Sequence, residues 1–155
     1  MNRAESYYNE IRTICSEHER CLSLKTAGKT LRFTLSSQNG KVNVWWDFFA
    51  DTVIVIARHS RKVASELLPT AMTWLNECNM YHGSDAYGVS SGGDLTFMAS
   101  YDLRYRSPRI DPGLDGFCTL VLETVPDRLD RIVGLMNGIK VEEPAPCEYH
   151  SAHTG

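Results

Sequence analysis

No apolar run in this sequence approaches the roughly 20 residues that a membrane-spanning helix needs. The first eight residues are polar and lack the apolar core of a signal peptide. The net charge of −3 offers no basic footprint for nucleic acid or for an anionic membrane surface. Together these absences predict a cytoplasmic protein that binds neither nucleic acid nor membrane.

Signatures of catalysis are also missing. The sequence has no P-loop, no Gly-x-Gly-x-x-Gly and no Gly-x-Ser-x-Gly. We therefore expect a protein that is not an enzyme, with no catalytic residue and no cofactor. One alternative stays open, a small hydrolase that uses Cys78 with His82 or Asp102 in an unrecognised pocket. Sequence alone shows neither a thiol of low pKa nor an oriented base.

Cysteines are few and their spacing is unhelpful for metal binding. The five are Cys15, Cys21, Cys78, Cys118 and Cys147, and no two have C-x-x-C spacing. Two Cys–His pairs could share a helical face, namely Cys15 with His18 and Cys78 with His82. A third group, Cys147, His150 and His153, lies in a polar tail. Because a structural zinc site needs about four ligands, we expect no metal site.

The stretch from Asp94 to Arg106 shows the clearest pattern that is present. Apolar side chains fall on every second residue from Leu95 to Tyr105, and mostly polar ones fall between them. A strand sends successive side chains to opposite faces, so this stretch predicts a strand with one face on a core. The preceding Ser-Ser-Gly-Gly turn and the run Ala86 to Val89 complete a predicted antiparallel hairpin.

The rest of the chain divides into alternating strands and amphipathic helices. Helical periodicity covers residues 4–19, 64–81 and 114–136, with Pro69 expected in a first turn and Pro126 expected to kink or split the last helix. Strands are predicted around residues 31–36, 42–48 and 52–57, the first two joined by Asn39-Gly40. Residues 21–29 remain ambiguous, because Leu22 and Leu24 could start a strand but Ala27-Gly28 signals a turn.

The expected fold is therefore α+β, with an antiparallel sheet of about five strands and helices packed on it in the order α-β-β-β-α-β-β-α. The linkers between the first strands are too short for parallel crossovers. One domain spans residues 1–140. Residues 141–155 are expected to form a disordered tail.

A short motif and the element order resemble a known family. The residues are Leu75-Asn76-Glu77-Cys78-Asn79, similar to a Leu-Asn-x-x-Asn signature, followed by the turn Gly92-Gly93-Asp94 and the alternating strand. These resemble the YbjN family, which belongs to a wider group with the fold of type III secretion chaperones. The resemblance implies a non-enzymatic, chaperone-like or regulatory domain that binds proteins or peptides and often pairs with itself.

The sheet is predicted to have a second apolar face. Alternation places Trp46 and Phe48 toward the core, so Trp45 and Phe49 must point the other way, together with Ile54, Ile56 and Met98. Such a face is either an interface or core beneath another segment. If it is an interface, these five residues bind a protein or peptide partner, and the protein is expected to be a homodimer or half of a heterodimer.

Overall fold

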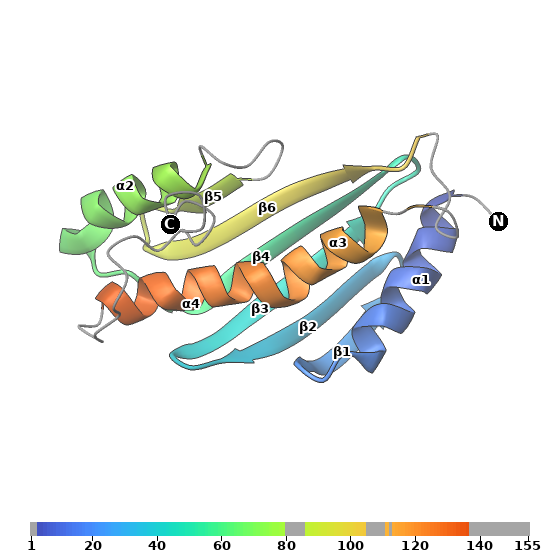
Figure 1. The fold of residues 1–155 in the computed structure, drawn as a ribbon, viewed down its shortest axis with the longest axis horizontal. Coiled ribbons are helices and arrows are strands. Elements are labelled where there is room, and N and C mark those ends of the chain that lie inside the picture. The colour runs from blue at the N-terminus through green and yellow to red at the C-terminus, as the bar shows by residue number, and fades with distance from the viewer. Residues whose placement is uncertain (1–2, 80–85, 105–110, 112, 137–155) are drawn as a thin grey trace, which may run out of the picture.

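The chain folds around one antiparallel sheet whose inner face carries the helices, as the computed structural model shows for residues 3–79, 86–104, 111 and 113–136 (Figure 1). The elements in chain order are α1 (Arg3–Glu17), β1 (Cys21–Ala27), β2 (Thr30–Ser37), β3 (Gly40–Phe48), β4 (Thr52–Lys62), α2 (Leu68–Asn79), β5 (Ala86–Val89), β6 (Asp94–Asp102), α3 (Gly113–Thr119) and α4 (Val125–Met136). The strand order is β1-β2-β3-β4-β6-β5. None of the helices in these ranges is long and apolar enough to cross a membrane.

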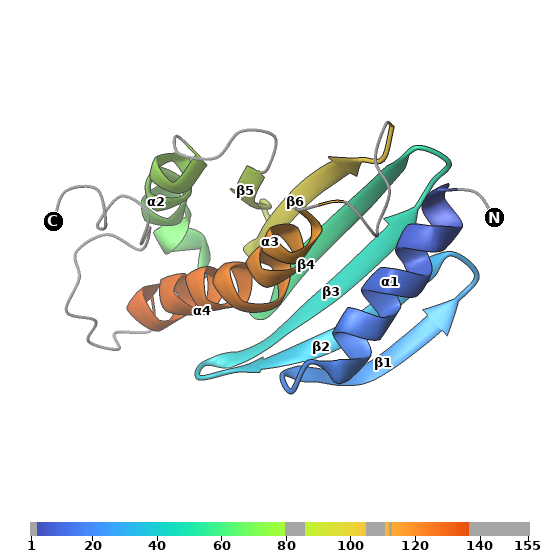
Figure 2. The same cartoon turned by 45° about the vertical axis from the view of Figure 1, so that its right-hand side comes forward.

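The helices in these ranges all lie on the same side of the sheet. α1 crosses over β1–β3, α3 and α4 run across the middle, and α2 packs beside β5 (Figure 2). The inner face supplies the core, and one row of it runs across five strands through Phe33, Val44, Ala57, Phe97 and Tyr87, all buried. This arrangement confirms the α+β class and the predicted meander and hairpin.

Within the described residues the sheet has six strands, not about five, and the element order differs from the predicted one, because β1 is an additional edge strand. Its regular alternation is broken by a β-bulge, in which Ser23 and Leu24 stand opposite the single residue Phe33. Ser23 has φ of 55°, an unusual backbone conformation for a residue other than glycine. The bulge places Leu22 on the outer face, where it is 42% exposed, and leaves Leu24 packed against the core. The alternation of Leu22 and Leu24 in the sequence therefore does not correspond to one face of the strand.

The last helical region contains a change of helix type directly before its proline. A π-helical turn, Leu120–Thr124, separates α3 from α4, and the N–H of Val125 donates to the carbonyl of Leu120. Pro126 follows as the second residue of α4, where its missing N–H costs little. The helical conformation therefore does not stop at the proline, and a π turn joins α3 to α4.

Asn79, the last residue of the short motif, joins α2 to the edge of the sheet. Its Nδ2 donates to the carbonyl of Tyr87 at 2.8 Å, and its Oδ1 accepts from the N–H of Tyr87 at 2.7 Å. One side-chain amide thus pairs with the backbone of β5 as a neighbouring strand would. Pro69 lies in the first turn of α2, as predicted.

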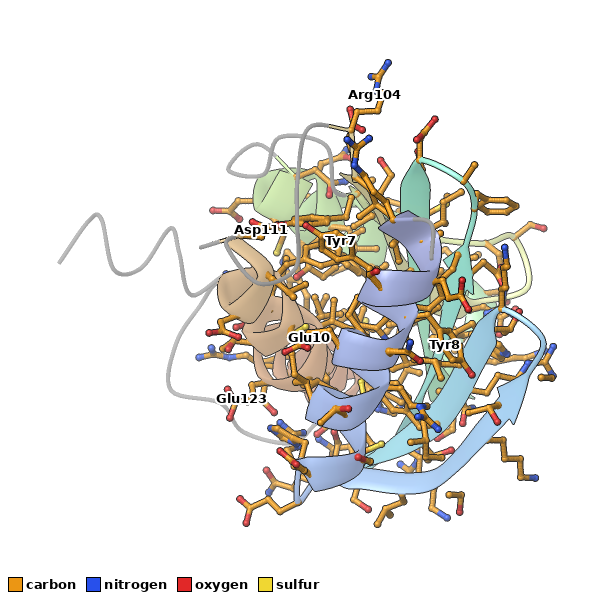
Figure 3. All side chains as sticks on the ribbon, turned by 90° about the vertical axis from the view of Figure 1, so that its right-hand side faces the viewer. Tyr7, Tyr8, Glu10, Arg104, Asp111 and Glu123 are labelled. Carbon is orange, nitrogen blue, oxygen red and sulfur yellow. The ribbon has the colours of Figure 1, made fainter. Side chains whose placement is uncertain are left out.

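Asp111 holds α1, β6 and α3 together at one end of the molecule. Tyr7 and Tyr101 both donate to its Oδ2, at 2.8 and 2.7 Å, and the N–H of Gly113 donates to its Oδ1 at 3.0 Å. Figure 3 shows Tyr7 and Asp111 turned toward each other. Tyr101 also stacks on Phe117 of α3 with ring centroids 4.6 Å apart. The network fixes α1 and the start of α3 against the inner face.

A candidate protein-binding face

The outer face of the sheet carries a continuous row of side chains that crosses all six strands. Cross-strand partners connect Lys25, Arg32, Trp45, Ile56, Met98 and Ala86, in that order from β1 to β5. None of the helices in the described ranges covers this face, because all of them pack on the inner side (Figure 3). At about 4.8 Å per strand, the row is about 24 Å long. We call the side of the sheet that carries this row the outer face.

Four of the five predicted binding residues come together on the outer face. Trp45 stands directly opposite Ile56, and Ile56 stands opposite Met98. Ile54 lies two residues from Ile56 on the same strand, and Met98 is 51% exposed. The fifth residue, Phe49, is 54% exposed and follows the end of β3, where its N–H donates to the carbonyl of Thr52 at 2.8 Å. These apolar side chains form a surface that the described helices leave uncovered.

Trp45 is held in place by a cation on the neighbouring strand. The guanidinium carbon of Arg58 lies 5.8 Å from the centre of the indole ring. Such contacts are attractive because the face of the ring is electronegative, and they contribute about 0.5–1 kcal/mol at exposed sites. Arg58 also adds positive charge beside the indole.

The basic end of the row contains a hollow of about 260 Å³. Its lining includes Ser23, Lys25, Arg32, Asn43 and Trp45. The bulge at Ser23 spreads β1 away from regular pairing at this point, and bulges commonly occur beside functional sites because they redirect side chains. Here the consequence is that Lys25 lies opposite Arg32 and both cations are exposed at the rim. This hollow was not predicted, because nothing in the sequence signals the bulge.

The other end of the row is apolar. Two shallow hollows of about 200 and 310 Å³ lie along β6 and β5, and both are lined by Ala86 and Met98. Ile54 lines the first of them, and Gly88 leaves the backbone open at the second. The outer face thus runs from a basic, polar hollow at β1–β3 to an apolar one at β6–β5, with Trp45 and Ile56 between them.

The thiols of Cys15, Cys21 and Cys118 are poorly suited to nucleophilic chemistry. Burial raises the pKa of Cys118 to about 12, with a smaller contribution from the negative charge of Asp115. Burial also raises the pKa of Cys21 to about 11 and shifts that of Cys15 upward, with a further contribution from the nearby Cys118 and Cys21. A thiolate is the reactive form, so these side chains stay neutral near pH 7.

The candidate metal and hydrolase groups are only partly within the described chain. His82, Cys147, His150 and His153 lie outside it. Across the described part of the chain, no three His, Cys, Asp or Glu side chains are placed to hold a metal ion. His18 lies 3.7 Å from Glu123, an ion-pair distance if the imidazole is protonated.

The structure separates the two described residues of the hydrolase alternative. Cys78 is fully buried in α2. Asp102 ends β6 at the opposite end of the molecule and pairs with Arg104 (Figure 1). The two side chains therefore do not share a pocket.

The arrangement defines a class of α+β proteins with helices on one face of an antiparallel sheet and the other face open. Comparison with protein-family models finds no match, and comparison with curated proteins finds none either. Among solved structures, the chain is similar to the crystal structure of YbjN, a putative transcription regulator from E. coli. The TM-score is 0.50 with 10% identity, over 95% of this chain and 91% of that chain. The likeness supports a YbjN-like fold, in agreement with the resemblance found in the sequence, and it concerns the fold alone.

Proposed function

We propose that this chain is a non-enzymatic protein-binding module of the YbjN type, and that it binds a segment of another protein on its outer face. The observation that carries the proposal is the row of half-buried Trp45 and Ile56 and exposed Met98, on a sheet whose other face is used by the core. Monomeric proteins rarely leave contiguous apolar side chains in water unless they form an interaction site. Aromatic side chains in such a patch are the usual anchors of a protein interface.

The chemistry of the outer face also favours binding over catalysis. Its central row is apolar or cationic, and the two hollows at β6 and β5 are lined mainly by apolar side chains and backbone. A catalytic site usually brings a nucleophile, a base and an oxyanion donor together. The outer face has a carboxylate at Asp47, which accepts a hydrogen bond from Thr30 at 2.8 Å. The expectation that the protein is not an enzyme stays part of this proposal.

The direct test is a comparison of proteins captured from native lysate by the wild type and by two tryptophan variants. Trp45→Ala removes the proposed anchor, and Trp74→Ala removes a half-buried tryptophan of α2, on the other side of the sheet. We expect Trp45→Ala to lose its specific partners by tenfold or more, while Trp74→Ala retains them. Identical sets of captured proteins from both variants would contradict the proposal.

The predicted homodimer would use the same face, and it stays a prediction. Light scattering at micromolar concentration measures it directly. A dimer that dissociates in Trp45→Ala but not in Trp74→Ala would place the second copy on the outer face. A wild type that is monomeric at these concentrations would contradict the predicted homodimer. The outer face would then have to bind a different partner.

A further inference from the structure

Three cations surround Trp45 without a carboxylate partner. Lys25, Arg32 and Arg58 are exposed, and within the described part of the chain none of them forms an ion pair or a hydrogen bond through its side chain. Lys25 and Arg32 stand opposite each other across the β1–β2 pair, where like charges repel. The chain as a whole is acidic, with a net charge of −3, so this concentration of positive charge is local. An anionic partner would relieve the repulsion.

We propose that the occupant of the outer face is an extended acidic segment of a partner protein, with its carboxylates at the hollow between Lys25 and Arg32 and an apolar side chain at Met98. This inference rests on the proposed function and names the partner's chemistry. The hollow of about 260 Å³ accommodates a carboxylate side chain and several waters, at about 30 Å³ per water. Thr34 and Asn43 border it and bond to each other at 3.0 Å.

The distance between Arg32 and Met98 determines how far apart the acidic and apolar residues of the bound segment should be. Arg32 and Met98 lie three strand positions apart along the row, which is about 14 Å at ~4.8 Å per strand. An extended chain advances about 3.4 Å per residue, so the carboxylate and the apolar side chain should be about four residues apart. Trp45 and Ile56 would then contact the residues between them.

A second copy of this chain offers poor charge complementarity for the same site. By alternation, the carboxylates that face outward from the sheet include Asp47, Asp94 and Asp102. Each is already engaged within its own chain, by Thr30, Ser90 and Arg104 respectively. The unpaired cations therefore favour a partner that brings its own carboxylates.

The test uses a fluorescein-labelled synthetic peptide with two glutamates, three serines and two leucines in that order, and a copy with glutamine in place of glutamate. Fluorescence anisotropy with the full chain should show the glutamate peptide binding at least tenfold more tightly than the glutamine peptide. Arg32→Glu should weaken binding at least tenfold. Arg12→Glu, the same charge change on the exposed side of α1, should leave it within twofold. The preference for glutamate should fall as salt rises, because charges at an exposed site are screened.

Other results overturn the inference in distinguishable ways. If both peptides bind equally and Trp45→Ala abolishes both, the outer face binds segments without selecting acidic ones, and the proposed function survives alone. If neither peptide binds, the proposed acidic pattern is wrong, while the capture experiment with Trp45→Ala still decides the proposed function. If replacing Glu142, Glu143 and Glu148 with glutamine strengthens peptide binding tenfold, residues 137–155 of the chain itself occupy the face. The assignment to a partner protein is then wrong.

Discussion

Asp130 on α4 accepts a hydrogen bond from His59 on β4, with 2.8 Å between Oδ1 and Nε2. The backbone N–H of Arg61 donates to Nδ1 of the same imidazole at 3.0 Å, which assigns the donating proton to Nε2. The carboxylate also accepts from the N–H and Nδ2 of Asn39, each at 3.1 Å, in the turn between β2 and β3. One buried side chain on the last helix thus fastens two separate parts of the sheet.

Replacing Asp130 with alanine should destabilise the fold by about 3 kcal/mol, because it leaves the buried Nε2–H of His59 and the backbone N–H of Asn39 without their acceptor. Asp127→Ala is the matched control on the same helix. Its carboxylate pairs with Arg20 at 3.1 Å but is 60% exposed, so we expect a loss below about 1 kcal/mol. Urea unfolding of both variants measures the difference. Equal losses would show that the contact between α4 and the sheet does not depend on Asp130.

Gly93 should tolerate no side chain, whereas Gly92 should tolerate one. Gly93 has φ of +89°, and a Cβ there would lie 2.2 Å from the carbonyl oxygen of Val63. The N–H of Val63 in turn donates to the carbonyl of Gly93 at 2.8 Å, so neither backbone can move away freely. We expect Gly93→Ala to cost about 2 kcal/mol or more, since the alanine is strained as well as crowded. Gly92→Ala, whose nearest neighbour would lie at 3.7 Å, should change the free energy of unfolding by less than about 1 kcal/mol. Thermal melts of the two variants check this contrast.

The two faces of the sheet should respond differently to the loss of an aromatic ring. Phe97 is fully buried on the inner face, so Phe97→Ala should destabilise by roughly 3–5 kcal/mol. Trp45 is half-buried on the outer face, and Trp45→Ala should cost much less in denaturant unfolding while weakening association by about 2 kcal/mol or more. Comparable unfolding losses in both variants would make Trp45 a core residue.

Stability should decline above pH 9 because of the buried thiols. Burial raises the pKa of Cys118 from 9.0 to about 12, so the folded chain keeps this proton over a range in which the unfolded chain loses it. The unfolded state then binds fewer protons, and the free energy of unfolding falls as pH rises, by up to about 1.4 kcal/mol per pH unit for one thiol. Cys118→Ala should reduce this slope above pH 9 and leave it unchanged below pH 8. Denaturant unfolding at closely spaced pH values measures the slope. An unaltered slope in Cys118→Ala would show that this thiol does not cause the loss of stability.

Local patterns in the sequence predicted most of the sheet, because alternation and turn residues act over a few positions. Asn39-Gly40 and Gly92-Gly93 marked two hairpins that the structure contains. β1 was left ambiguous between a strand and a turn, and its irregular geometry could not be predicted, for a physical reason. Leu22 and Leu24 would share a face in a regular strand, but the bulge at Ser23 sends them to opposite faces.

Contacts between residues far apart in the sequence could not be predicted from such local patterns. The alternation Val53, Val55, Ala57 places His59 on the inner face, which marks a buried polar group but not its partner. Asp130 lies 71 residues away, on a helix whose rotation depends on the π turn before it. The apolar side chains of the outer face were predicted individually, whereas the cations that surround Trp45 depend on the register between strands.

The helices α3 and α4 follow every strand of the sheet in the sequence, and this order has a consequence for synthesis. As the chain leaves the ribosome, the strands emerge first, with large side chains such as Trp46 and Phe97 on a face that α3 and α4 later cover (Figure 1). Apolar surface exposed in this way promotes aggregation and attracts chaperones. A nascent chain halted before Gly113 emerges should therefore bind a hydrophobic dye more strongly than one halted after Met136 has emerged. The packing of α3 and α4 would then remove this apolar surface from the newly made chain.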